Sequence, residues 1–104
     1  MQPKSKDGRR APRIKLSQPV RIRPFDPSCM PETSTTVNLS RHGMYFKTSV
    51  AHYFAGMGIA VTRNFIPNDP FSREEDGEVV RVERLQNGQY GVAVRILPIK
   101  LSPA

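Results

Sequence analysis

The chain has 104 residues, including ten prolines and seven glycines, and a formal net charge of +7. That length suits one small domain, and the proline and glycine content favours short elements over long helices. No apolar run approaches the roughly 20 residues of a membrane helix, and no apolar segment follows the basic N-terminus as in a signal peptide. Cys29, the single cysteine, excludes an internal disulfide and a multi-cysteine zinc site. We therefore expect a soluble, cytoplasmic protein.

The positive charge is concentrated near the N-terminus. Residues 1–23 contain eight basic residues and one acidic residue, whereas residues 24–104 contain eight of each. Such a segment attracts nucleic acid, an anionic membrane surface or a phosphorylated small molecule. Residues 1–13 also lack a periodic apolar pattern, which predicts a flexible basic leader. The folded domain is predicted over residues 14–97, followed by a C-terminal tail at 98–104.

Short strands with alternating apolar and polar residues are predicted after the leader. The first lies within residues 14–23, where Pro19 indicates an interruption or a sheet edge. Further strands are expected over residues 33–37, 44–48 and 58–64. Residues 65–77 contain prolines and an acidic run, so we expect a long surface loop there.

The last two strands give the clearest local signal. Residues 80–83 and 92–96 each alternate apolar and polar side chains, and Asn87-Gly88 lies between them. Asn-Gly supplies the two positive φ angles of a type I′ turn, which suits the twist of a hairpin. About six strands with turns between them predict an all-β barrel or sandwich, and a closed barrel leaves few unpaired edges.

No arrangement of side chains indicates catalysis or a metal site. Ser40 and His42 have no evident third group that would orient the histidine. The acidic residues 74–76 are adjacent on a predicted loop and are not paired across a cleft. His52 and Cys29 lack the spacing of metal ligands. We therefore expect neither an enzyme nor a bound metal or cofactor.

Two polar clusters remain as candidate binding elements. The first is Arg9-Arg10-Ala11-Pro12-Arg13, between the leader and the first strand. The planar fork of arginine can hold a phosphate, or guanine through O6 and N7, and it can stack on a base. Taken alone, the same residues also fit an ordinary basic tail.

The second cluster is Asn38-Leu39-Ser40-Arg41-His42-Gly43, at a predicted strand end. Asn38 and Ser40 would share one face and offer hydrogen-bond donors and acceptors, while Leu39 would point into the core. Gly43 permits a positive φ angle or a close backbone approach. Taken alone, these residues also fit an ordinary turn.

Together the two clusters resemble the RxxxR and NxSxxG motifs of the PilZ domain family. Arg9 to Arg13 match the first motif, and Asn38 to Gly43 match the second. The flanking segments are similar as well, so the resemblance spans about residues 9–97. These segments are RRAPRIKLSQPVRIR, NLSRHGMYF, GEVVRV and GVAVRI.

The resemblance implies a six-stranded antiparallel β-barrel, with a C-terminal helix that is short or absent in this chain. It also implies binding of the bacterial second messenger cyclic di-GMP (c-di-GMP). The arginines would contact guanine and phosphate, and the second motif would bind a guanine on the barrel surface. The ligand-binding residues carried over by position are Arg9, Arg10, Arg13, Asn38, Ser40 and Gly43.

The function that we expect is that of a receptor or adaptor. The leader would become ordered on the ligand and present a changed surface to a downstream protein partner. Whether one ligand or a stacked pair binds stays open. One alternative is a PilZ-like adaptor that acts through protein contacts without a ligand. A nucleic-acid-binding barrel is favoured by the basic leader but lacks a clustered aromatic face.

Overall fold

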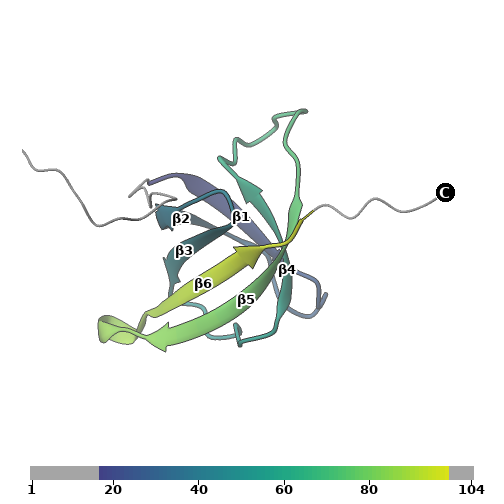
Figure 1. Ribbon diagram of the computed structural model, residues 1–104. Helices are drawn as coiled ribbons and strands as arrows, with labels where there is room; N and C mark the ends of the chain where they lie inside the picture. Colours follow the sequence, from purple (N-terminus) through teal and green to yellow (C-terminus); the bar gives the residue numbers. More distant parts are fainter. Residues whose placement is uncertain (1–16, 99–104) are drawn as a thin grey trace, which may run out of the picture.

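The computed structural model describes residues 17–98. Its strands are β1 (Pro19–Pro24), β2 (Glu32–Leu39), β3 (Gly43–Thr48), β4 (Gly58–Arg63), β5 (Glu75–Arg84) and β6 (Tyr90–Ile96). They close into a barrel in the order β1-β2-β3-β6-β5-β4, with all neighbours antiparallel (Figure 1). The predicted six-stranded antiparallel all-β barrel is thus confirmed. Within the described residues the one helical element is the short 3-10 turn η1 (Gln86–Gly88), and no helix is long and apolar enough to span a membrane.

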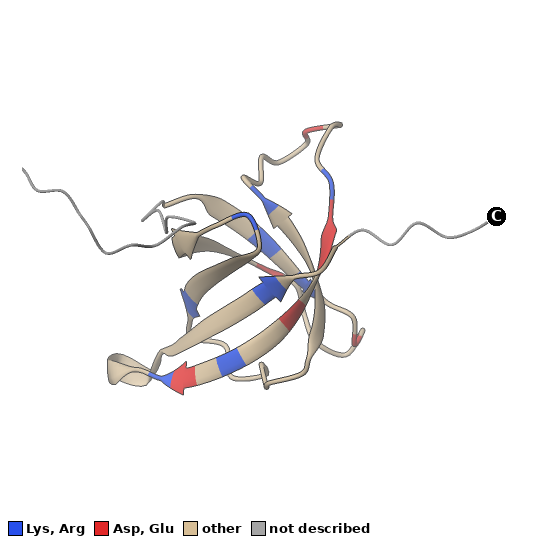
Figure 2. Ribbon diagram, in the orientation of Figure 1, with Lys and Arg blue, Asp and Glu red and all other residues tan. Residues whose placement is uncertain are grey.

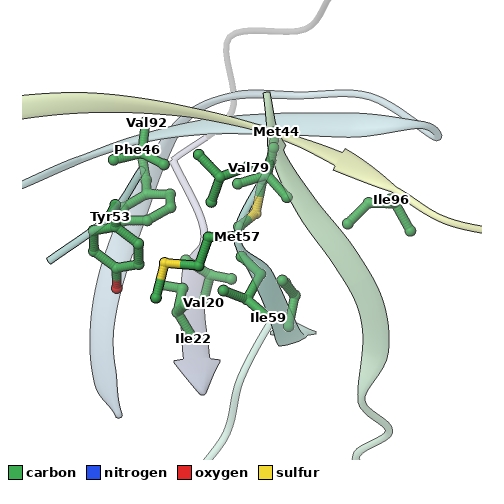
Figure 3. Packing of buried hydrophobic residues seen from close by; sticks show 12 residues of the cluster. Val20, Ile22, Met44, Phe46, Tyr53, Met57, Ile59, Val79, Val92 and Ile96 are labelled. Carbon is green, nitrogen blue, oxygen red and sulfur yellow. The ribbon is translucent and has the colours of Figure 1, made fainter. Parts of the chain in front are cut away.

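The barrel interior is filled by one face of each strand. On β1, Val20 and Ile22 are fully buried, as the alternation in the sequence predicts. Figure 3 shows Phe46 beside Tyr53, whose ring meets it edge-on with 5.5 Å between the centroids. Burying each such side chain contributes roughly 1.5–3 kcal/mol. The core consists of Val20, Ile22, Met44, Phe46, Tyr53, Met57, Ile59, Val61, Val79, Val92, Val94 and Ile96.

The predicted loop over residues 65–77 is shorter than expected, because β5 already begins at Glu75. Glu75 pairs with Val61 of β4, and its carboxylate accepts two hydrogen bonds of 2.8 Å from Arg63. The acidic run has the composition of a loop. Barrel closure nevertheless requires β5 to reach back along β4, and this pairing overrides the local composition.

A bulge interrupts the alternation in β5. Its pairing with β6 shifts between Val79 and Arg81, so that Val80 is an extra residue. Val79 is fully buried and Val80 is 47% exposed. The prediction that Val80 faces the core is therefore wrong, because the bulge gives that place to Val79, whereas Val82 is partly buried and packs against the core as predicted.

The β5–β6 hairpin turns where the sequence predicted. Asn87 and Gly88 have φ angles of 64° and 70°, the two positive values of a type I′ turn. Strand pairing ends at Arg84 and Tyr90, so residues 85–89 make the connection. This turn and the β4–β5 loop lie at opposite ends of the barrel (Figure 1).

Candidate functional site

An open hollow of about 320 Å³ lies on the outer face of the barrel, over β2, β3, β5 and β6. Part of its lining is the predicted NxSxxG element: Asn38, Ser40 and Gly43. The rest of its lining is Leu39, Met44, Tyr45, Arg81, Glu83 and Ala93. We call this the motif hollow. The predicted RxxxR residues, Arg9, Arg10 and Arg13, lie outside the described residues.

A larger hollow of about 890 Å³ lies beside the β4–β5 loop, between residues 63–76 and the segment Leu97-Pro98. Asn38, Ser40 and Gly43 of the predicted second motif do not line it. We take the motif hollow as the candidate site, although it is smaller, because Asn38, Ser40 and Gly43 of the predicted second motif line it.

Gly43 brings the end of the motif against the backbone of β6. It pairs with Arg95, and a Cβ atom at this position would lie 2.8 Å from the carbonyl oxygen of Val94. Gly43 is not among the described residues with a positive φ angle. Of the two roles that the sequence left open for this glycine, the structure shows the close backbone approach.

The turn between Ser40 and Gly43 is anchored from both ends. The Ser40 amide donates to the Gly43 carbonyl at 2.9 Å, and the Ser40 hydroxyl reaches the same oxygen at 3.4 Å. Arg63 donates from Nη1 to the Ser40 carbonyl at 3.0 Å. Because the same guanidinium holds Glu75 with two further bonds, the turn is tied to β4 and β5.

Asn38 directly follows an irregularity in β2. The pairing of β2 with β3 shifts between Thr36 and Asn38, so that Val37 is an extra residue and Asn38 opposes Tyr45. Bulges commonly re-aim side chains beside functional sites. The Asn38 amide makes no hydrogen bond to the part of the chain that the structure describes, which leaves both its donor and its acceptor for a ligand.

Three polar side chains that the sequence analysis missed complete the site, and we call them the Glu83 cluster. The Tyr45 hydroxyl donates to Oε1 of Glu83 at 3.0 Å, and Nε of Arg81 donates to Oε2 at 3.0 Å. Tyr45 is on β3, while Arg81 and Glu83 are on β5. Since β6 lies between these strands and pairs with both, this strand pairing brings the cluster together, and no short motif could have revealed it.

Gly91 lets the Tyr45 side chain cross β6. A Cβ atom on Gly91 would lie 2.6 Å from Cζ of Tyr45 and would also collide with the hydroxyl oxygen. Gly91 itself pairs with Lys47 on one side and Glu83 on the other. The tyrosine therefore reaches Glu83 through space that only a glycine leaves empty.

Within the Glu83 cluster, the carboxylate accepts hydrogen bonds from a neutral and a positively charged donor. The hydrogen bonds from Tyr45 and then Arg81 lower the pKa of Glu83 below its ordinary value. Burial, followed by the bond to Glu83, raises the pKa of Tyr45. At neutral pH Glu83 is thus an anionic acceptor and Tyr45 a donor. Acidic and basic residues both occur along β5 (Figure 2).

The motif hollow can hold a polar, planar group by hydrogen bonds on its edges. An amide, a hydroxyl, a guanidinium and a carboxylate all line it, and together they supply donors and acceptors. No group of three or more His, Cys, Asp or Glu within residues 17–98 could hold a metal ion. The donors and acceptors that line the hollow suit binding of a small polar molecule.

The PilZ domain family model matches residues 7–102. The chain belongs to the PilZ domain family. The family predicted from the sequence is thereby confirmed. PilZ domains are regulatory binding domains.

Three solved structures are similar in fold to this PilZ domain. The inhibitor of motility MotI/DgrA of Bacillus subtilis is 16% identical with a TM-score of 0.66, over 93% of this chain and 46% of that chain. This chain thus spans about half the length of that protein. The PilZ domain of CeSA from a cellulose-synthesizing bacterium is 19% identical with a TM-score of 0.63, over 86% and 84% of the two chains.

The PilZ domain of YcgR from Escherichia coli, solved with c-di-GMP, is 14% identical with a TM-score of 0.64, over 90% of this chain and 81% of that chain. At these identities the three structures show that the fold is shared. Comparison with curated proteins gives no match.

Proposed function

We propose that this PilZ domain binds c-di-GMP in the motif hollow and works as a receptor or adaptor, not as an enzyme. One observation carries the proposal: Asn38, Ser40 and Gly43 line a single hollow on the barrel surface. Membership of the PilZ family supports the ligand class, as does the YcgR domain that was solved with c-di-GMP.

The second motif is suited to a guanine base. The Asn38 amide offers a donor and an acceptor, and the Ser40 hydroxyl offers a rotatable donor and acceptor. The glycine at position 43 keeps β3 close to β6, so no side chain projects into the hollow there. Guanine presents both donors and acceptors on its edges, and these two side chains can pair with them.

The first motif supplies positive charge in this proposal. Arg9, Arg10 and Arg13 hold the two phosphates and the O6 and N7 edge of guanine. The leader, residues 1–13, becomes ordered on the ligand, which costs about 2–5 kcal/mol. Two or three charge-assisted hydrogen bonds of about 1.5–3 kcal/mol each offset that cost.

The ordered leader then presents a new surface to a downstream protein partner. The division into a leader, a barrel over residues 14–97 and a tail at 98–104 is part of this proposal. So is a cytoplasmic location. No metal or cofactor is required for the binding step.

Calorimetric titration with c-di-GMP, with GTP as the control ligand, tests the proposal. Arg13→Ala and Ser40→Ala should each weaken binding about tenfold or more, as expected for a lost hydrogen bond to a charged or closely fitted group. Lys6→Ala removes one positive charge from the leader outside the motif, and it should change affinity far less.

The proposal fails if the folded protein, checked by circular dichroism, shows no saturable binding of c-di-GMP at moderate salt. Such a result favours an adaptor that acts without ligand. Oligonucleotide affinity that falls steeply with salt, without preference for c-di-GMP, favours a nucleic-acid-binding barrel. When binding does occur, the molar ratio separates one ligand from a stacked pair.

A further inference from the structure

We infer that Glu83 is a specificity-determining residue of the motif hollow, whose carboxylate accepts the hydrogen bonds that guanine donates from N1–H and its 2-amino group. Tyr45 and Arg81 are its positioning residues. This inference rests on the proposed function, because it assumes that a guanine base enters the hollow.

Among the described residues that line the motif hollow, Glu83 is the one carboxylate. Its side chain is 42% exposed, so a ligand in the hollow can reach it. Each carboxylate oxygen has two lone pairs. Tyr45 uses one of them on Oε1 and Arg81 uses one on Oε2, which leaves one acceptor position on each oxygen.

The remaining acceptor positions match the edge of guanine. N1–H and the 2-amino group are adjacent donors, and a carboxylate can accept from both in parallel, as it does from an arginine fork. The Asn38 amide has a single acceptor oxygen and cannot make that paired contact by itself. Ser40 likewise has a single oxygen. Glu83 is thus the residue of the hollow whose chemistry separates guanine from other purines.

The carboxylate is held in place before any ligand arrives. Tyr45 and Arg81 bind its two oxygens from strands on either side of β6, and both distances are 3.0 Å. Because Val80 is the extra residue of β5, Arg81 and Glu83 lie opposite Ala93 and Gly91 of β6. Ala93 lines the hollow with only a methyl group, while Tyr45 crosses β6 over Gly91 to hold Glu83. A fixed acceptor binds with a smaller entropy loss than a mobile one.

An ionised Glu83 also selects against other bases. The hydrogen bonds from Tyr45 and Arg81 lower its pKa, so it can only accept at neutral pH. Adenine presents an acceptor at N1, which would face the carboxylate without a proton between them. Hypoxanthine keeps N1–H but lacks the 2-amino donor. The affinity of the protein should therefore be highest for c-di-GMP, lower for its inosine analogue cyclic di-IMP, and lowest for cyclic di-AMP.

Calorimetric titration with c-di-GMP and with cyclic di-IMP tests this role in the full chain. The wild-type protein should bind c-di-GMP about tenfold or more tightly than cyclic di-IMP, as expected for one lost hydrogen bond to a charged acceptor. Glu83→Gln, which nearly preserves shape, should reduce that ratio to about threefold or less.

Glu78→Gln is the matched control. Glu78 lies on the same strand, pairs with Arg95, has a side chain that is 36% exposed, and does not line the motif hollow. Its substitution removes the same negative charge, and the preference for c-di-GMP over cyclic di-IMP should stay at the wild-type ratio.

The outcomes separate this inference from the proposed function. No binding of c-di-GMP by the wild-type protein rejects the proposed function. If the wild-type protein binds c-di-GMP and cyclic di-IMP with equal affinity, or if the affinity ratio is unchanged in Glu83→Gln, the role of Glu83 is rejected and the proposed function is not. If Glu83→Gln does not unfold cooperatively, the ratio is measured in Tyr45→Phe, which keeps the ring and removes one bond to the carboxylate. The ratio should then fall severalfold, and an unchanged ratio rejects the inference.

Discussion

Replacing Gly91 by alanine tests the place that the structure assigns to the Tyr45 ring. A Cβ atom at position 91 would lie 2.6 Å from Cζ of Tyr45, so the ring or strand β6 must move. Forcing a methyl group into packed surroundings costs about 1–3 kcal/mol, while alanine favours a strand over glycine by about 0.5–1 kcal/mol. The free energy of unfolding should therefore fall by roughly 0–2.5 kcal/mol.

The coupling between positions 91 and 45 is more informative than either single change. In a Tyr45→Ala background the ring is absent, so Gly91→Ala should instead raise stability by about 0.5–1 kcal/mol. The double-mutant cycle should give a coupling energy of about 1–3 kcal/mol. Urea titrations of the four proteins, followed by circular dichroism, measure these free energies.

An equal effect of Gly91→Ala in both backgrounds would refute the reasoning, because the conflict would then not involve the ring. As a control, the slope of the unfolding free energy against urea concentration should be the same in all four proteins, which shows that their unfolding reactions are comparable. The single variant Gly91→Ala should also bind c-di-GMP more weakly, since displacement of the Tyr45 ring takes its hydroxyl away from Glu83.

Two further predictions concern the anchor of the motif and the core. Arg63→Lys should weaken c-di-GMP binding about fivefold, equal to roughly 1 kcal/mol, because lysine lacks the fork that holds Glu75 and the Ser40 carbonyl together. Calorimetric titration measures this loss of affinity. Arg23→Lys is the control, because its partner Glu74 lies outside the motif hollow, and it should show no such loss. Stability should fall as the pH rises above about 10, because burial and then the hydrogen bond to Glu32 raise the pKa of Tyr53 above its ordinary value of 10.0. The unfolded chain then releases this proton before the folded one does. Urea midpoints between about pH 8 and pH 11 should fall less in Tyr53→Phe, and an equal fall would contradict the assignment.

Much of the barrel could be predicted because its signals are local. The predicted strands overlap all six observed strands, and Asn87-Gly88 marks the hairpin turn through its backbone preference. The motif Asn38 to Gly43 is also contained in six consecutive residues. The roles of Arg9, Arg10 and Arg13 stay predictions, because these residues lie outside the described part of the chain.

The parts that could not be predicted depend on pairing between distant strands. The composition of the acidic start of β5 predicts a loop. This segment is a strand because it pairs with Val61 and its neighbours on β4. The extra residues Val37 and Val80 are visible only when each strand is read against its partner. A one-residue shift exchanges the inner and outer faces, so alternation alone could not assign Val80.

The sequence by itself determined the fold class and the position of the second motif, because strand periodicity and turn chemistry act over a few residues. Only the tertiary structure decided what surrounds that motif. Tyr45 and Glu83 are 38 residues apart, and they meet because the barrel closes with a glycine of β6 between them. The energy that places them is the burial of the common core, a property of the whole chain that no local pattern records.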